Sequence, residues 1–455
     1  MDNEVFHIMS QAFSLSKKAE KVGEAYKSAS TLYKEGKLTE EFHVTFGWIA
    51  YRYLKEKYIA LGSKGARTIL ATYFKLKMER PSLIHSMFLY LAINIKKRYP
   101  DFRFTSFMDM WGYDNFRNED WVPYIKEQQS FPSTVQKVIN LCMAENKDNK
   151  AKELSESFVG LLKKAVAKYP QDYNSKRYLA IALARKGEKA EAVEVYRELL
   201  IYDNRYYLWN ELGNLIGDRQ LKKSAFCMAL LKQKKEEYLG SIHLSLAELL
   251  IGYGDYGQAL TDLEKYKRTY DTNKWTISVQ YHSLIGRIPS GTMPAKRNAE
   301  WLKKQAKPIQ GFVMKKLPSQ TMFMQDVFTS KKGNKMCRML AYDKSTIICD
   351  YGKCPDLHDS QGDFFRVYYT KREHWTQVVY IEKATEEDVR QDWKDNISRL
   401  EGKIRITAKA DGKMFGFVKD CYVGKHLLKG IKNGMSVQVV AFKENNKMYA
   451  LKVII

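Results

Sequence analysis

Residues 402–455 read "GKIRITAKADGKMFGFVKDCYVGKHLLKGIKNGMSVQVVAFKENNKMYALKVII". Apolar and polar residues alternate in four short runs of this stretch: "KIRIT", "MFGFV", "SVQVVAF" and "MYALKVI". Turn-forming residues separate the runs at positions 410–412, 432–434 and 445–446. Runs of β-branched and aromatic residues with a period of two, divided by such turns, predict about five short strands. Strands this short and close together are expected to close into a small β-barrel over residues 401–455.

The centre of this stretch carries aromatic residues in a strand pattern. Phe415 and Phe417 are two positions apart and therefore share one face of a strand, and Tyr422 begins a second aromatic strand. The surrounding lysines are Lys409, Lys413, Lys419, Lys425 and Lys429. Bases of a single strand stack on aromatic rings while its phosphates meet lysines, so the pattern indicates a nucleic-acid-binding surface. In the alternative interpretation the rings pack inward and the lysines are ordinary solvated surface.

The same residues resemble a cold-shock domain, which has the OB fold. "KMFGFV" at 413–418 is similar to the first RNP motif of that family, and "CYVGKH" at 421–426 is similar to the second. The resemblance implies binding of single-stranded RNA or DNA by Lys413, Phe415, Phe417, Tyr422, Lys425 and His426. Two features depart from the family pattern. Ile406 stands where the family has a stacking tryptophan, and Gly424 and Lys425 are inserted before the histidine.

A repeat occupies the middle of the chain. Its marker alanines, Ala192, Ala225 and Ala259, are 33 and 34 positions apart, and Trp209 marks the second copy. Small residues at such positions let the two helices of a hairpin approach closely, and large ones fill the space to the next hairpin. The pattern resembles the tetratricopeptide repeat (TPR). It predicts an α-solenoid over residues 151–286, and the resemblance implies a concave groove that binds a protein or peptide.

Residues 1–150 contain apolar residues at helical spacing and are expected to be divergent copies of the same solenoid. The stretch "PDFRFTSFMDMWGYDNFRNEDWVPY" at 100–124 interrupts this pattern, because it has no clean period and is crowded with aromatic residues. One interpretation makes it a docking loop for a partner. The other, which we favour, packs its rings onto the neighbouring helices.

Three further segments follow the repeats. Residues 287–320 are expected to be a basic, proline-containing linker around one short helix. Strand-like runs predict a second OB-like barrel over residues 321–384. The candidates for a second stacking face in this barrel are Phe365, Tyr368 and Tyr369, of which at least one is expected to pack in the core. Residues 385–400 are expected to form a helix between the barrels, with Thr385 as its cap.

The net charge of +24 favours an anionic partner, of which nucleic acid is the commonest. Residues 301–455 hold 29 Lys and Arg against 17 Asp and Glu, a net charge of +12. In the alternative interpretation, a lysine-rich surface only keeps the protein in solution. The first residues lack the apolar core of a signal peptide, and no apolar run is long enough to span a membrane. Six cysteines do not form a disulfide framework, so we expect a cytoplasmic protein without a membrane partner.

Residues that could carry chemistry are sparse. Cys349, Cys354 and His358 form the pattern C-x4-C-x3-H, which lacks a fourth ligand and the short C-x2-C spacing of zinc sites. The sequence contains none of the common phosphate-binding, dinucleotide-binding, metalloprotease or serine-hydrolase motifs. We therefore expect no metal, no cofactor and no enzymatic activity.

Together these patterns predict a multidomain α plus β protein, with a TPR-like α-solenoid followed by two small β-barrels of OB type. This order of domains resembles bacterial TPR and OB proteins of predicted conflict systems of the TOTE type, which implies defence against invading nucleic acid. The predicted function is that of a non-enzymatic adaptor. Its last barrel binds single-stranded RNA or DNA, and its solenoid holds a protein partner. The alternative is a pure protein–protein interaction scaffold, which the two departures from the cold-shock pattern keep open.

Overall fold

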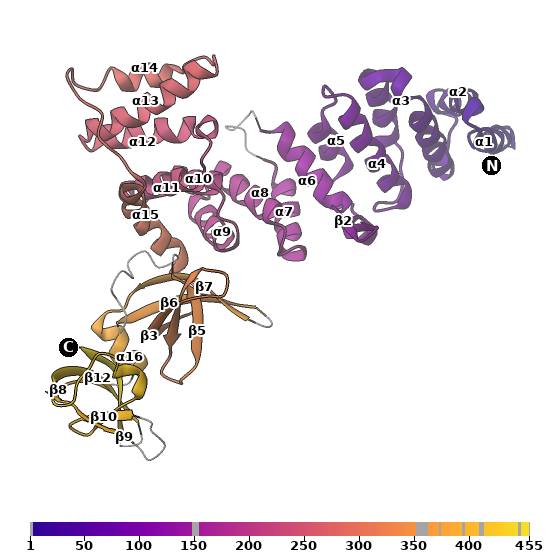
Figure 1. The fold of residues 1–455 in the computed structure, drawn as a ribbon. Coiled ribbons are helices and arrows are strands. Elements are labelled where there is room, and N and C mark those ends of the chain that lie inside the picture. Colours follow the sequence, from indigo (N-terminus) through magenta and orange to yellow (C-terminus); the bar gives the residue numbers. More distant parts are fainter. Residues whose placement is uncertain are drawn as a thin grey trace. The chain divides into compact units, whose positions relative to one another are not determined.

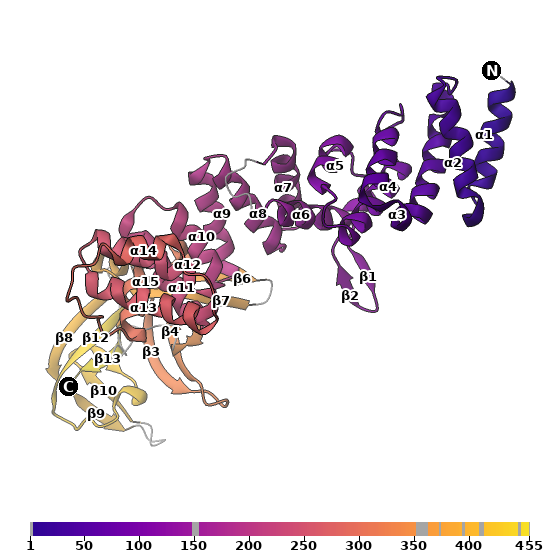
Figure 2. The ribbon, with the colours of Figure 1, turned by 90° about the horizontal axis from the view of Figure 1, so that it is seen from above.

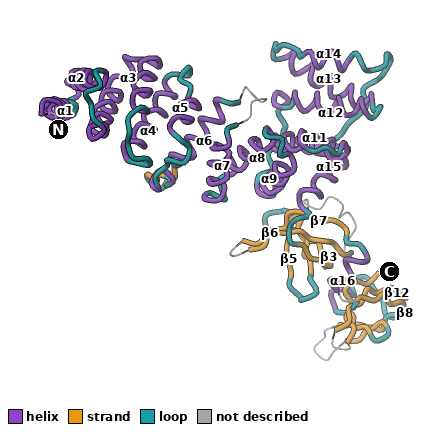
Figure 3. Tube along the Cα trace, turned by 180° about the vertical axis from the view of Figure 1, so that it is seen from behind, coloured by secondary structure: helices purple, strands orange, loops and turns teal. Residues whose placement is uncertain are grey.

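The computed structural model describes residues 3–147, 154–351, 363–372, 375–393, 396–408, 414–444 and 447–454 (Figure 1). It has two compact units, Met1–Leu199 and Leu200–Ile455. Helices occupy the N-terminal and central parts of the chain, and strands dominate the C-terminal part (Figure 3). The protein is therefore a multidomain α plus β protein, in which a TPR-like helical array precedes two curled, half-barrel sheets.

The first unit is a row of helices in which each packs against the next from α1 to α8. Its helices are α1 (Asn3–Leu15), α2 (Val22–Lys34), α3 (His43–Phe74), α4 (Leu83–Arg98), α5 (Phe104–Trp111), α6 (Thr134–Glu145), α7 (Glu156–Lys168), α8 (Tyr173–Arg185) and α9 (Lys189–Tyr202). Helix α3 is interrupted at Gly62, whose φ of 63° lies in the left-handed region that glycine adopts readily. A short hairpin of β1 (Tyr124–Lys126) and β2 (Gln129–Phe131) projects from the helices (Figure 2).

The aromatic stretch at 100–124 packs mainly into the first unit, which confirms the packing interpretation. Its buried rings are Phe102, Phe104, Phe107, Trp111, Tyr113 and Phe116. The expectation of an irregular stretch was wrong at 104–111, where α5 forms. The apolar side chains at 104, 107, 108 and 111 are spaced three and four apart and face the core, which is enough to stabilise this short helix.

A buried histidine shows how this core satisfies its polar groups. Nε2 of His85 lies 2.9 Å from the carbonyl oxygen of Trp111 and donates to it, so Nδ1 accepts from the hydroxyl of Tyr73 at 2.6 Å. The imidazole also stacks on the indole of Trp111, with ring centroids 4.3 Å apart. Burial lowers the pKa of His85 to about 4. His85 is thus a neutral, structural residue.

Helical hairpins continue in the second unit, and their contacts bear out the repeat frame. The helices are α10 (Tyr206–Leu215), α11 (Arg219–Lys232), α12 (Gly240–Gly252), α13 (Tyr256–Thr272), α14 (Val279–Ile285) and α15 (Ala299–Met314). Ala225 and Ala259 are fully buried, as is Ala192 in α9. At Gly213 a Cβ atom would lie 2.9 Å from the ring of Phe226 in the paired helix. The small residues therefore stand where the helices approach most closely.

Residues 287–320 hold an extended segment and the 16-residue helix α15, which packs along α11. Arg297, just before α15, lies against α13 and binds Asp262 with two hydrogen bonds, of 2.7 and 2.8 Å. Asp262 also lies 2.8 Å from Nδ1 of His243, whose Nε2 is 2.9 Å from a carboxylate oxygen of Glu236. The side chains of Arg297, Asp262 and His243 are at most 2% exposed. We call these three residues, together with the more exposed Glu236, the buried network.

The first sheet is antiparallel, in the order β5-β4-β3-β6-β7. Its strands are β3 (Ser319–Thr329), β4 (Lys335–Leu340), β5 (Thr346–Asp350), β6 (Phe364–Arg372) and β7 (Trp375–Lys383). The alternation of apolar and polar residues predicts no strand at 319–329, yet β3 is the central strand of this sheet. Met322, Phe323 and Met324 are all buried, because β3 is covered on both faces and so shows no alternation of apolar and polar residues.

The second sheet has the order β8-β12-β13-β11-β10-β9, with β11 and β13 parallel. Its strands are β8 (Ile397–Lys403), β9 (Arg405–Ala408), β10 (Met414–Val418), β11 (Cys421–Val423), β12 (Ser436–Glu444) and β13 (Lys447–Ile454). Helix α16 (Glu386–Trp393) links the sheets. The amide of Asp388 donates to Thr385 Oγ1 at 3.1 Å, which confirms the cap. The predicted helix is wrong at 397–400, which belong to the unpredicted strand β8.

Candidate nucleic-acid interface

Strand β10 separates its side chains onto two faces. Val418 points into the core of the second sheet, whereas Phe415 and Phe417 lie half-buried outside that core. Gly416 also faces inward, because a Cβ atom there would lie 3.2 Å from the carbonyl oxygen of Arg405 and from the side chain of Ile404. The glycine thus lets β10 lie close to β9, while both phenylalanines stay on the outer face.

The neighbouring strands complete a group of rings on this outer face. Phe415 stacks on Tyr422 of β11, with centroids 5.8 Å apart and ring planes at 24°. Phe417 meets the same tyrosine edge-on at 5.8 Å, and Tyr422 meets Tyr449 of β13 at 6.3 Å. Tyr422 is 37% exposed and Tyr449 is 36% exposed. We call these four residues the aromatic face.

Tyr449 was missed by the sequence analysis, although the signal was present. The run "MYALKVI" was predicted to be a strand, and alternation then places Met448 and Ala450 on one face and Tyr449 on the other. In the structure Met448 and Ala450 pack against the core of the sheet, and Tyr449 faces outward. The missing information was that β13 pairs with β11, which brings Tyr449 beside Tyr422.

Cationic side chains lie around the aromatic face. Arg405 of β9 is exposed and pairs in register with Phe417. Lys425 and His426 are both exposed and lie on the 3-10 turn that follows β11. The imidazole of His426 packs over Gly424, where a Cβ atom would be only 3.0 Å from the ring. The sixth predicted site residue, Lys413, lies outside the described residues.

The first sheet does not present the second stacking face that the sequence suggested. Phe365 is 2% exposed and Tyr368 is 4% exposed, so the expected core role is confirmed for both. The hydroxyl of Tyr368 donates to a carboxylate oxygen of Glu382 at 2.7 Å, and burial raises the pKa of this tyrosine. Tyr369 is half-buried and does not join the other two rings on an open surface.

The described residues hold no group of three His, Cys, Asp or Glu side chains that could bind a metal ion. Of the C-x4-C-x3-H pattern, Cys349 is buried on β5 with its Sγ 3.1 Å from Sγ of Cys337, whereas Cys354 and His358 lie outside the described part of the chain. In that same part, no helix combines the length and apolar character needed to cross a bilayer.

Part of the helical array is similar in sequence to a known domain family. The domain of unknown function DUF7017 matches residues 175–308. The crystal structure of BtubC (BKLC) from P. vanneervenii is similar at 12% sequence identity, covering 65% of this chain and 96% of that chain, with a TM-score of 0.17. No curated protein matches the chain in sequence. Residues 175–308 are therefore similar to the DUF7017 domain, and the aromatic face lies outside the matched region.

Proposed function

We propose that the C-terminal sheet binds single-stranded nucleic acid, RNA or DNA, on its aromatic face. One observation carries this proposal. The rings at 415, 417, 422 and 449 lie together on the outer face of three adjacent strands, while the alternate residues of those strands fill the core. Rings that only stabilised the sheet would be expected on its inner face, where they bury more apolar area. Rings on an open face can instead stack on unpaired bases.

The net charge of the C-terminal sheet also favours a nucleic acid as the partner. Residues 401–455 contain 11 Lys and Arg against 4 Asp and Glu, a net charge of +7. Arg405 and Lys425 stand exposed beside the rings, where they can meet the phosphates between stacked bases. Each phosphate that is neutralised releases counterions, so binding is expected to weaken steeply as salt is added.

We further propose that the whole chain is a non-enzymatic adaptor in the cytoplasm, with its TPR-like helices holding a protein partner. Stacking and phosphate contacts bind a strand without breaking a bond, which suits an adaptor. None of the described cysteines forms a disulfide, in keeping with a reducing compartment. The resemblance to conflict-system proteins suggests defence against foreign nucleic acid as the setting. The domain order of those proteins is consistent with the helical array followed by two sheets in this chain.

A second candidate function is that of a scaffold that binds only proteins. The observation in its favour is the β1–β2 hairpin of the first unit. Val122, Tyr124 and Ile125 are 64%, 59% and 70% exposed on and beside this hairpin. Exposed apolar side chains that gather in one place commonly mark contacts with another protein.

The deciding experiment measures oligonucleotide affinity and melting temperature together. Fluorescence anisotropy with labelled single-stranded RNA and DNA, at low and high salt, would be compared for the wild type, Phe415→Ala and Phe417→Ala. Tyr124→Ala is the matched control, because it removes an exposed ring that lies far along the chain from the aromatic face. Loss of one stacking ring should cost about 1–3 kcal/mol of binding, which is roughly a 5- to 150-fold loss of affinity.

The loss of stability on mutation to alanine distinguishes a ring that binds a base from a ring that packs in the core. Phe415 and Phe417 are half-buried, so their replacement should cost well below the roughly 3–5 kcal/mol of a core Phe→Ala change. Weakened binding with a nearly unchanged melt, and an unchanged Tyr124→Ala control, would support the aromatic face. Wild-type protein that binds no single strand even at low salt would favour the scaffold.

A further inference from the structure

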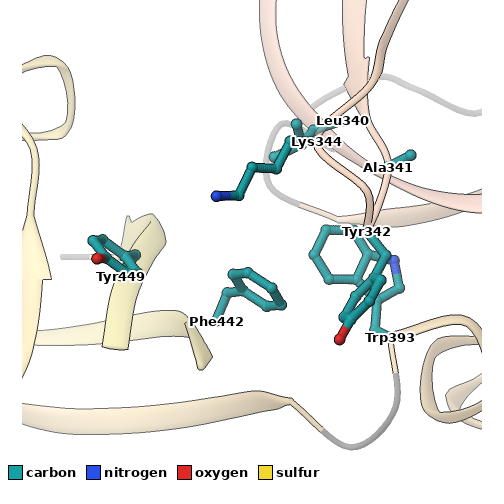
Figure 4. A pocket seen from close by; sticks show the side chains of 7 residues that line it. All are labelled: Leu340, Ala341, Tyr342, Lys344, Trp393, Phe442 and Tyr449. Atoms are coloured by element: carbon teal, nitrogen blue, oxygen red, sulfur yellow. The ribbon is translucent and has the colours of Figure 1, made fainter. Parts of the chain in front are cut away.

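A cleft lies beside the aromatic face, where the two sheets of the second unit meet (Figure 4). Its volume is about 390 Å³, within the range of roughly 300–1,000 Å³ that is usual for small-molecule pockets. The aromatic and cationic residues that line it are Tyr342, Lys344, Trp393, Phe442 and Tyr449. Trp393 and Phe442 are buried in its wall, so Tyr342 and Tyr449 supply the accessible ring surface and Lys344 supplies the cation. Aromatic surface beside a cation is the chemistry that a nucleotide needs.

The walls of the cleft are held in place by contacts between the sheets. Phe442 of β12 meets Tyr342 edge-on at 5.7 Å and Trp393 edge-on at 5.5 Å. The indole nitrogen of Trp393 donates to the carbonyl oxygen of Thr321 at 3.0 Å, which fixes the end of α16 on β3. The cleft is therefore a built feature, with its rings oriented before any ligand arrives.

The cationic group stands at the mouth of the cleft. Lys344 is exposed in the turn between β4 and β5, and its φ of 66° places it in the left-handed region. Figure 4 shows its amino group directed over the space between Tyr449 and Phe442. A phosphate at this position would lie next to a base held between the rings.

The cleft is continuous with the aromatic face. Tyr449 belongs to both, since it lines the cleft and contacts Tyr422 at 6.3 Å. Phe442 pairs in register with Tyr449 across β12 and β13. A run of rings therefore extends from Phe415 through Tyr422 and Tyr449 to Phe442.

We propose that this cleft is a second nucleotide site for the strand that lies on the aromatic face. A base enters beside Tyr342 and Tyr449, the two rings of the cleft that are not buried, and the adjoining phosphate pairs with Lys344. This inference rests on the proposed function, because it needs a strand on the aromatic face. It adds that the first sheet takes part in binding and that the bound strand passes from one sheet to the other. The positive charge of the region and the shared Tyr449 favour nucleic acid over an apolar peptide as the occupant.

The test uses the full chain and labelled single strands of about 4 and about 12 nucleotides, both within the range of about 4–16 nucleotides that one OB barrel covers. Lys344→Glu should leave binding of the short strand unchanged, since the aromatic face alone holds it. The same change should weaken binding of the long strand by about tenfold. The slope of log affinity against log salt concentration should fall by about 1, as expected when one phosphate contact is lost. Lys332→Glu is the matched control, because it makes the same charge change in another exposed turn of the first sheet.

A second measurement does not depend on affinity. A long strand containing 5-iodouracil should cross-link to Tyr342 on irradiation, and mass spectrometry would identify the peptide. Equal effects of Lys344→Glu and Lys332→Glu, or cross-links confined to Tyr422, would overturn the second site while leaving the proposed function intact. If the wild type binds neither strand, the proposed function fails and the second site fails with it.

Discussion

Replacing Arg297 by methionine tests the connection between the last helical segment and the helical array. The guanidinium group of Arg297 makes two hydrogen bonds to Asp262, and it donates to the side chain of Gln258 at 2.9 Å and to its carbonyl oxygen at 3.0 Å. Methionine keeps much of the apolar volume but none of the hydrogen bonds. Asp262, which is completely buried, then loses its strongest partner.

The size of the effect follows from burial and depends on pH. Removing one partner of a buried ion pair costs about 3–5 kcal/mol, because the other charge stays buried without it. His243 modulates this cost. Burial alone would lower the pKa of His243, but hydrogen bonds to Asp262 and Glu236 outweigh it and raise the pKa. Below its raised pKa the charged imidazole partly replaces Arg297, so we expect a loss of about 3 kcal/mol near pH 6 and a larger loss at higher pH, as His243 gives up its proton.

Urea unfolding followed by circular dichroism measures the change. With a slope of about 3 kcal/mol per molar urea, the midpoint should fall by roughly 1 M near pH 6 and more near pH 8. Lys296→Met is the matched control, because its side chain is exposed one position earlier. The double variant Arg297→Met, Asp262→Leu should recover much of the loss, since it removes the stranded charge. A change of less than about 1 kcal/mol at both pH values would refute the reasoning.

Three further predictions concern the helices. Fragments 1–316 and 1–285 should both be strongly helical, but the longer should melt at the higher temperature, because α15 packs against α11. Equal melting temperatures would contradict this contact. In the intact chain, His243→Gln should be less stable than the wild type mainly below the raised pKa of His243, so the difference in free energy of unfolding should shrink as the pH rises from about 6 to 8.5. A stability difference that grows with pH would contradict the buried network. Gly213→Ala should cost about 1–3 kcal/mol of stability in thermal unfolding, because a Cβ atom would press on the side chains of α11, whereas Gly217→Ala, with open space around it, should cost less than about 0.5 kcal/mol. Similar losses for the two variants would show that the hairpin is not close-packed.

The helical array could be predicted from the sequence because its signals are local. Marker alanines at a fixed interval identify hairpins without any knowledge of distant contacts, and Ala192, Ala225 and Ala259 are all buried where that frame requires. Strands β3 and β8 could not be predicted from the sequence, for a different reason. Strand β3 is buried on both faces, so its apolar run has no period, and β8 follows a capped helix so closely that its first residues extend the helical pattern.

The site shows the same division between local and distant information. Alternation alone placed Phe415 and Phe417 on one face of a strand. Which face that was depended on the rest of the sheet, and Tyr449 joined the group only through the parallel pairing of β11 and β13. The bonds of Arg297 join residues 35 positions apart along the chain, so no local pattern indicated them.

The position of β13 determines the order in which the second sheet is completed as the chain is made. β13 is the last described strand to be synthesised, yet it lies between β12 and β11 in the middle of the second sheet. Until it leaves the ribosome, β11 is paired only with β10, and Tyr422 lacks the ring of Tyr449 beside it. A nascent chain therefore emerges with its helical array complete and its aromatic face unfinished. If the aromatic face binds nucleic acid as proposed, that binding would begin only after β13 has left the ribosome.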